Sequence, residues 1–165
     1  MDAESWVEQY AEFAVSARQV DADLSADFDP DLITQTLGIE PARTRRRGEL
    51  GSHGKPRLFS TWSWLTPRRI EFSSEAVLIE LLNHVEPKAD ALTVAANRYD
   101  VEYFVCLVIE MHGFVETGSE GKPDFLVATP AVVFQPATLA RLSALNLGLT
   151  FDQYVYADAP GLDRN

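Results

Sequence analysis

The sequence predicts a single α+β domain, built on an antiparallel or mixed sheet whose helices pack mainly on one face. Its 165 residues, of which 46% are apolar, are enough for one hydrophobic core. Segments in which apolar residues alternate occur between segments in which they recur every three or four positions. The resulting order is strand, helix, hairpin, helices, strand, helix and strand. We expect the domain to span residues 1–156 and a polar tail to follow at residues 157–165.

The first predicted elements are a strand and a short helix. Alternation of apolar with other residues predicts the strand over about residues 7–20. The helix begins after Asp29, because an aspartate is a good N-cap and Pro30 suits the first turn. Gly38 is the expected stop, with Pro41 beyond it.

A hairpin with a long glycine-containing loop follows. Residues 43–48 predict its first strand and residues 57–65 its second, because Phe59, Trp62 and Trp64 favour a pleated surface. Side chains two positions apart on a strand point the same way, so the two tryptophans are expected on one face.

The middle of the chain predicts two helices and the clearest strand. In residues 73–87 apolar side chains recur at helical spacing, behind a serine cap and before Pro87. Residues 89–99 predict a further helix or a helical turn. In residues 101–112 every second residue is apolar and the residues between them form a mixed face, which predicts a strand at the centre of the sheet.

The last part of the chain predicts one more helix and one more strand. Residues 117–124 are rich in turn formers, and residues 132–134 read as a short extended piece. A helix is expected from Pro136 with Gly148 as its stop, and residues 149–156 close the domain as a strand.

The charge balance limits the classes of partner. The net charge is −11, so the mean field of the protein repels phosphate and argues against general affinity for nucleic acid or anionic membranes. One cysteine, Cys106, allows no intramolecular disulfide and suits a reducing compartment. The acidic start lacks the features of a secretory signal, and no apolar run reaches the roughly 20 residues of a spanning helix. We therefore expect a cytoplasmic protein without a membrane span.

Positive charge gathers in one segment against this acidic background. Residues 43–69 contain eight basic residues and one acid, Glu49, a local balance of +7. We call residues 43–65 the basic hairpin and take it as the candidate surface for a protein partner or a small anionic ligand. Its cations and tryptophans, with two residues of the last strand, are the candidate binding residues: Arg43, Arg45, Arg46, Arg47, Lys55, Arg57, Trp62, Trp64, Asp152 and Tyr154.

Two interpretations of the basic hairpin compete. In the structural one, the tryptophans pack beneath the helices and the arginines pair with acids of the same protein. In the functional one, arginines and ring edges form a pocket for an anionic or aromatic ligand, or a docking face for an acidic partner. Asp152 and Tyr154 share a face of the last strand, and an ion pair between Asp152 and a hairpin arginine is favoured over catalysis.

The sequence predicts no catalytic residue, metal ligand or cofactor. Five residues separate Gly48 from Gly54, where a phosphate-binding loop needs four, and the loop joins strands instead of preceding a helix. The three histidines, His53, His84 and His112, lack metal-ligand spacing. Cys106 lies in an apolar strand and is typical of a small buried hydrophobe.

The order of several motifs resembles that of a known bacterial family. The stretches "DLSADFDPDLITQTLGIEPARTRRRGE", "STWSWL" and "LARLSALNLGLTFDQYVY", with a leucine-rich helix between the second and third, resemble the family catalogued as domain of unknown function 4279, over about residues 13–156. The resemblance implies a compact cytoplasmic α+β domain with no established activity. It brings no catalytic residues to this chain.

We therefore expect a non-enzymatic cytoplasmic interaction domain that uses the basic hairpin. The first alternative is an immunity-type or inhibitor protein whose acidic surface covers a basic toxin or nuclease. The second alternative is a hydrolase or transferase whose site is assembled only in the fold.

Overall fold

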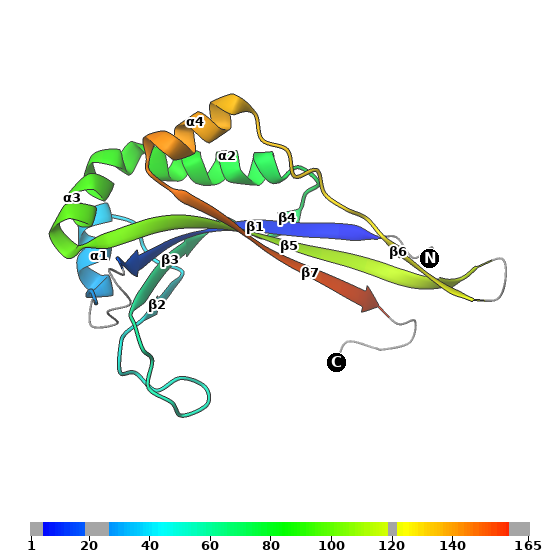
Figure 1. Ribbon diagram of the computed structural model, residues 1–165, viewed down its shortest axis with the longest axis horizontal. Coiled ribbons are helices and arrows are strands. Elements are labelled where there is room, and N and C mark those ends of the chain that lie inside the picture. The colour runs from blue at the N-terminus through cyan, green and yellow to red at the C-terminus, as the bar shows by residue number, and fades with distance from the viewer. Residues whose placement is uncertain (1–4, 19–26, 119–121, 159–165) are drawn as a thin grey trace.

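Seven strands form one sheet in the computed structural model, which describes residues 5–18, 27–118 and 122–158. Their order is β2-β3-β1-β5-β6, with β4 also on β1 and β7 also on β5. In Figure 1, α2 and α4 lie above the sheet and α1 and α3 lie at its left-hand end, while no helix covers the lower face of its middle and right-hand parts. The predicted α+β class with helices on one face is thus confirmed. The strands are β1 (Trp6–Ala17), β2 (Arg43–Arg45), β3 (Thr61–Leu65), β4 (Arg69–Ile70), β5 (Val101–Thr117), β6 (Pro123–Val127) and β7 (Gly148–Asp158).

The longest antiparallel pairing in the sheet joins β1 to β5. The two strands run antiparallel from the pair Trp6 and His112 to the pair Ala17 and Val101. The other described pairings are antiparallel too, except that β7 runs parallel to β5 along its second edge. The sheet is therefore mixed, one of the two arrangements that the sequence left open.

The helices begin and end at the signals that the sequence carries. Before α1 (Pro30–Leu37), the Asp29 carboxylate accepts from the backbone N–H of Asp31 at 3.0 Å, and Gly38 ends the helix with a φ of 61°. Ser73 caps α2 (Ser74–Val85) through the N–H of Ala76. The remaining helices are the 3-10 turn η1 (Glu86–Lys88), α3 (Ala89–Tyr99) and α4 (Pro136–Ala144).

Trp62 is the largest side chain of the core beneath the helices. It is fully buried, meets the ring of Phe13 edge-on at 6.0 Å and donates its indole N–H to Thr34 Oγ1 at 2.9 Å. Trp64 lies on the same face, partly buried and stacked on His84 at 4.0 Å. Trp62 is therefore out of reach of a ligand, and both rings have the packing role of the structural interpretation.

Some local predictions are wrong. The strands β4 and β6 were not predicted, and residues 117–124, which the sequence assigns to turn formers, contain the end of β5 and the start of β6. β6 exists because β5 continues five residues beyond its last pair with β1, so its free edge can pair with residues 123–127. α4 ends at Ala144, before Asn146 with a φ of 53°, and Gly148 starts β7 instead of stopping the helix. Residues 19–20 of the first predicted strand and 159–165 of the predicted tail lie outside the described residues.

Charged hydrogen bonds fasten α4 to α2. Arg141 donates to both oxygens of Glu86 at 2.6 and 2.7 Å, and Glu75 accepts from Thr138 Oγ1 and from the N–H of Gln135, each at 2.7 Å. These bonds lower the pKa of both carboxyl groups, since they favour the charged form.

Truncation of the central tryptophan tests this core. We expect Trp62→Ala to lower the free energy of unfolding by about 3–5 kcal/mol, because it empties a fully buried volume and leaves Thr34 without its donor. Urea unfolding followed by circular dichroism measures the loss. The control Val133→Ala, at a side chain 65% exposed, should stay within about 0.5 kcal/mol of the parent. Equal stability of the parent and Trp62→Ala would contradict this packing.

Three hydrogen-bonded carboxyl groups predict a loss of stability in acid. Asp29, Glu75 and Glu86 each have a pKa lowered in the folded state, through hydrogen bonds from Arg46, Thr138 and Arg141 respectively. Their stabilising effect is complete above the pKa of the unfolded chain and is lost as the pH falls through the folded-state pKa. The free energy of unfolding should therefore fall from pH 6 to pH 3, and less steeply in Glu86→Gln. An equally steep fall in that variant would show that Glu86 takes no part.

Candidate functional site

The face of the sheet opposite the helices carries a polar hollow next to the basic hairpin. Arg43 and Arg45 point to this face from β2, because their partners Ser63 and Thr61 lie on the side of β3 opposite Trp62. The hollow has a volume of about 380 Å³ and is floored by small side chains such as Ala14. Its far side carries Glu12, Cys106, Thr150 and Asp152.

A second hollow lies inside the hairpin itself and adjoins the first. We call the first the open-face hollow and the second the hairpin hollow. The hairpin hollow has a volume of about 360 Å³ and shares Arg45, Phe59 and Thr61 with its neighbour. No acidic side chain is among the described residues that line it. The rest of its lining is Gly51, Ser52, His53, Lys55, Pro56, Arg57 and Leu58.

Backbone hydrogen bonds and two glycines shape the hairpin loop. Gly48 donates to the carbonyl of Arg57 at 2.9 Å, and the N–H of Arg57 donates to the carbonyl of Glu49 at 2.9 Å. Gly48 and Gly54 have φ values of 82° and 69°, which side chains with a Cβ rarely adopt. The loop is therefore a folded-back ribbon that presents Lys55 and Arg57 on the same side as Arg45.

The hairpin cations divide into paired and unpaired groups. Arg46 binds Asp29 and Asp31 at the start of α1, an ion pair that also raises the pKa of Arg46. The backbone N–H of Arg47 donates to Ser60 Oγ at 3.1 Å. Within residues 5–18, 27–118 and 122–158, no carboxylate lies within ion-pair distance of the other four cations, which are Arg43, Arg45, Lys55 and Arg57.

The two candidates on β7 lie in different places. Asp152 lines the open-face hollow with Arg43 and Arg45 but forms no ion pair with them, so the predicted pair is absent from the described structure. Tyr154 lies next to Glu110 in the strand register, outside both hollows. The charge of Asp152 raises the pKa of Tyr154.

The groups of the enzyme interpretation are not brought together. His53 lines the hairpin hollow and Asp152 lines the open-face hollow, and neither hollow contains both. Burial raises the pKa of the Cys106 thiol, which keeps it protonated and weakens it as a nucleophile.

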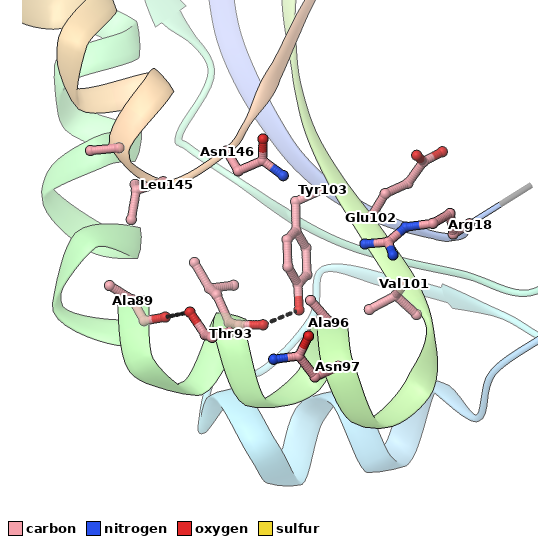
Figure 2. Close-up of a pocket in the computed structure, with 12 residues that line it drawn as sticks. Arg18, Ala89, Thr93, Ala96, Asn97, Val101, Glu102, Tyr103, Leu145 and Asn146 are labelled. Carbon is pink, nitrogen blue, oxygen red and sulfur yellow. Dashed lines mark hydrogen bonds between the residues drawn. The ribbon is translucent and has the colours of Figure 1, made fainter.

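A further pocket lies at the other edge of the core, between α3 and the start of β5 (Figure 2). It has a volume of about 260 Å³. The Tyr103 hydroxyl points into its base and donates to the Leu92 carbonyl at 2.8 Å, while Thr93 donates to the Ala89 carbonyl at 3.1 Å. Arg18 at its rim pairs with Asp100. These polar groups already have protein partners, so this pocket is a weaker candidate than the hairpin hollow.

Sequence reasoning missed one cluster on the open face, formed by Glu8, Glu110 and His112. The spacing of Glu110 and His112 was a usable signal, since residues two apart on a strand share a face. The position of Glu8 beside Glu110 depends on the register of β1 with β5, which spacing within either strand does not reveal.

Comparison with known proteins gives one match, to a protein family. The family model described as "Domain of unknown function (DUF4279)" matches residues 8–156. No curated protein and no solved structure matches. Among the described residues, no helix has both the length and the apolar character needed to cross a bilayer.

The environment of Cys106 predicts slow thiol chemistry. The side chain is 8% exposed and burial raises its pKa. We expect the native protein to react with a disulfide reagent such as DTNB at least about tenfold more slowly than the protein unfolded in urea. The absorbance of the released thiolate measures both rates. A native rate above the unfolded one would instead indicate an activated thiolate.

Proposed function

Since the chain belongs to the DUF4279 family, whose description assigns no activity, we propose its function from the surface itself: a non-enzymatic binding domain that holds an organic anion in the hairpin hollow. The anion is a carboxylate, phosphate or sulfonate joined to an apolar group. The proposal keeps the hairpin cations as the binding residues and leaves the two tryptophans to the core.

One observation carries the proposal: Arg45, Lys55 and Arg57 line a single hollow whose described lining contains no acid. This is unusual in a chain of net charge −11, where acids outnumber bases 25 to 14. Cations that share a hollow repel one another, and an anion placed between them removes that repulsion. Among the other described arginines, Arg98 rests over the Tyr99 ring, and five form ion pairs with acids, namely Arg18, Arg46, Arg68, Arg69 and Arg141.

The apolar part of the ligand is inferred from the same lining. Leu58 and Phe59 are 64% and 46% exposed beside the cations. An aromatic or aliphatic group would cover them, while guanidinium groups bind the anionic end through paired N–H donors. The hollow thus combines the two features that favour an amphiphilic anion over inorganic phosphate alone.

The neighbouring hollow sets the direction of the ligand. Its far side carries Glu12 and Asp152, which repel a second negative group. The anionic end therefore stays at the hairpin, and only a neutral or cationic part extends over the floor of the sheet towards β7.

The acidic-surface alternative has less support at the residue level. Asp29, Asp31 and Glu110 form ion pairs with arginines of the same chain. Paired acids present less negative field to a basic partner than the net charge suggests. The hairpin proposal therefore has the more specific observation behind it.

The test uses 8-anilinonaphthalene-1-sulfonate, a fluorescent probe with a sulfonate on an aromatic body. We expect saturable binding that weakens when the salt concentration is raised from 50 to 500 mM. Arg57→Glu should lower the affinity at least about tenfold, or about 1.4 kcal/mol. Its free energy of unfolding should change by no more than about 1 kcal/mol, because Arg57 has no ion pair in the described structure.

Arg98→Glu is the matched control. Arg98 lies on α3 over the Tyr99 ring, outside the hairpin, and its reversal changes the net charge by the same amount. It should leave the affinity within about twofold of the parent value. Unchanged binding in Arg57→Glu, or an equal loss in both variants, would refute the hairpin site.

A further inference from the structure

A cluster of three potential ligands lies on the open face at the far end of the sheet from the basic hairpin. Glu8 on β1 and Glu110 on β5 are direct register partners, and His112 follows two residues later, opposite Trp6. One ligand atom from each of Glu8, Glu110 and His112 lies within 4.8 Å of the other two. In Figure 1 this part of β1 is the end near the N-terminus, away from the hairpin loop.

His112 is buried with both ring nitrogens unpartnered. Its side chain is 9% exposed, and neither Nδ1 nor Nε2 has a hydrogen-bond partner among the described residues. A buried polar group without a partner destabilises the folded state, so this position requires an explanation. Ring stacking holds the imidazole in place, with Trp6 at 4.6 Å on one side and Tyr156 at 5.0 Å on the other.

The gap between His112 and Glu8 fits an ion better than a hydrogen bond. Nε2 is 3.9 Å from the nearest oxygen of Glu8, beyond hydrogen-bond reach. A zinc ion lies about 2.0–2.2 Å from each nitrogen or oxygen ligand, which separates neighbouring ligand atoms by roughly 3–4 Å. The observed spacing requires only small side-chain movements to match this.

The carboxylates of Glu8 and Glu110 carry two negative charges and share one arginine. Like charges directly opposite each other on neighbouring strands destabilise a sheet. Arg68 provides one positive charge, 2.7 Å from Glu110 and 3.8 Å from Glu8. Its side chain is 50% exposed and rests over the Tyr10 ring at 5.1 Å, so it reaches the cluster from the surface and can leave it. A divalent ion would balance both carboxylates.

We propose that Glu8, Glu110 and His112 form a binding site for a divalent transition-metal ion, with Arg68 holding the place of the ion when it is absent. One imidazole nitrogen and two carboxylate oxygens are ligands that zinc accepts, and three protein ligands leave a position open for water or a further ligand. The imidazole favours a transition metal over magnesium or calcium. This site is independent of the anion site proposed at the hairpin.

The first test is titration of tag-free, chelator-treated full chain with Zn²⁺ by calorimetry. We expect one ion per chain and a raised midpoint of thermal unfolding. His112→Gln and Glu8→Gln should each lower the affinity at least about tenfold, since even residues that only orient a metal ligand cost 10- to 100-fold when changed. Glu8 is only half-buried, so Glu8→Gln provides the result if His112→Gln does not fold.

His84→Gln is the matched control. His84 is also stacked on a tryptophan, Trp64 at 4.0 Å, but belongs to no described group of three close ligands. It should bind Zn²⁺ as the parent does. Equal losses in His84→Gln and His112→Gln, or no binding by the parent at about 1 mM Zn²⁺, would overturn the proposal.

Arg68→Met separates a metal site from a purely internal ion pair. If the ion takes the place of the guanidinium, this variant should bind Zn²⁺ at least about threefold more tightly, because no cation must be displaced. Zn²⁺ should also raise its midpoint of unfolding more than that of the parent. Unchanged or weaker binding in Arg68→Met would show that the carboxylates need Arg68 itself and would refute the replacement.

Discussion

The antiparallel register of β1 with β5 is the constraint on which the rest of the structure depends. Twelve consecutive residues of β1 are paired, and their side chains alternate between the two faces. Phe13 and Val105 are thereby placed together under the helices, while Glu12 and Cys106 meet on the open face. A slip by one residue would exchange the two faces, expose the core and bury the carboxylates. The separation of a packed face from an open face, which carries both proposed sites, follows from this one register.

The distribution of ion pairs then explains why the hairpin differs from the rest of the surface. Arg46 closes the start of α1 and Arg141 fastens α4 to α2, so these arginines serve the fold. The tip of the hairpin projects beyond the sheet and the helices (Figure 1), and Glu49, the one acid of its loop, accepts from the backbone N–H of Arg46 and does not line the hollow. Lys55 and Arg57 therefore have no ion pair within the described residues, although acids are in excess in the chain as a whole.

Local physics explains which parts of this structure could be predicted from the sequence. The caps at Asp29 and Ser73 and the alternation of residues 101–112 act over a few residues, and the structure follows them. β6 and the neighbour relation of Glu8 to His112 depend on pairings between distant segments, which no local pattern specifies. The sequence does not distinguish Arg46 from Arg43 and Arg45. Arg46 alone of these three forms an ion pair, because the fold places Asp29 and Asp31 at the start of α1 within its reach.

The same register shows that the two proposed sites act independently. Arg43 pairs with Ser63, and Ser63 with Ala14, so Arg43 lies level with a residue of β1 that is six positions from Glu8, about 20 Å along the strand. This exceeds the screening length of about 8 Å at physiological ionic strength. The hairpin cations therefore cannot balance the carboxylates of Glu8 and Glu110, and the carboxylates cannot balance the cations. Each end of the open face therefore has its own charge balance: Arg68 pairs with the carboxylates at one end, and an anionic ligand is what we propose for the cations at the other.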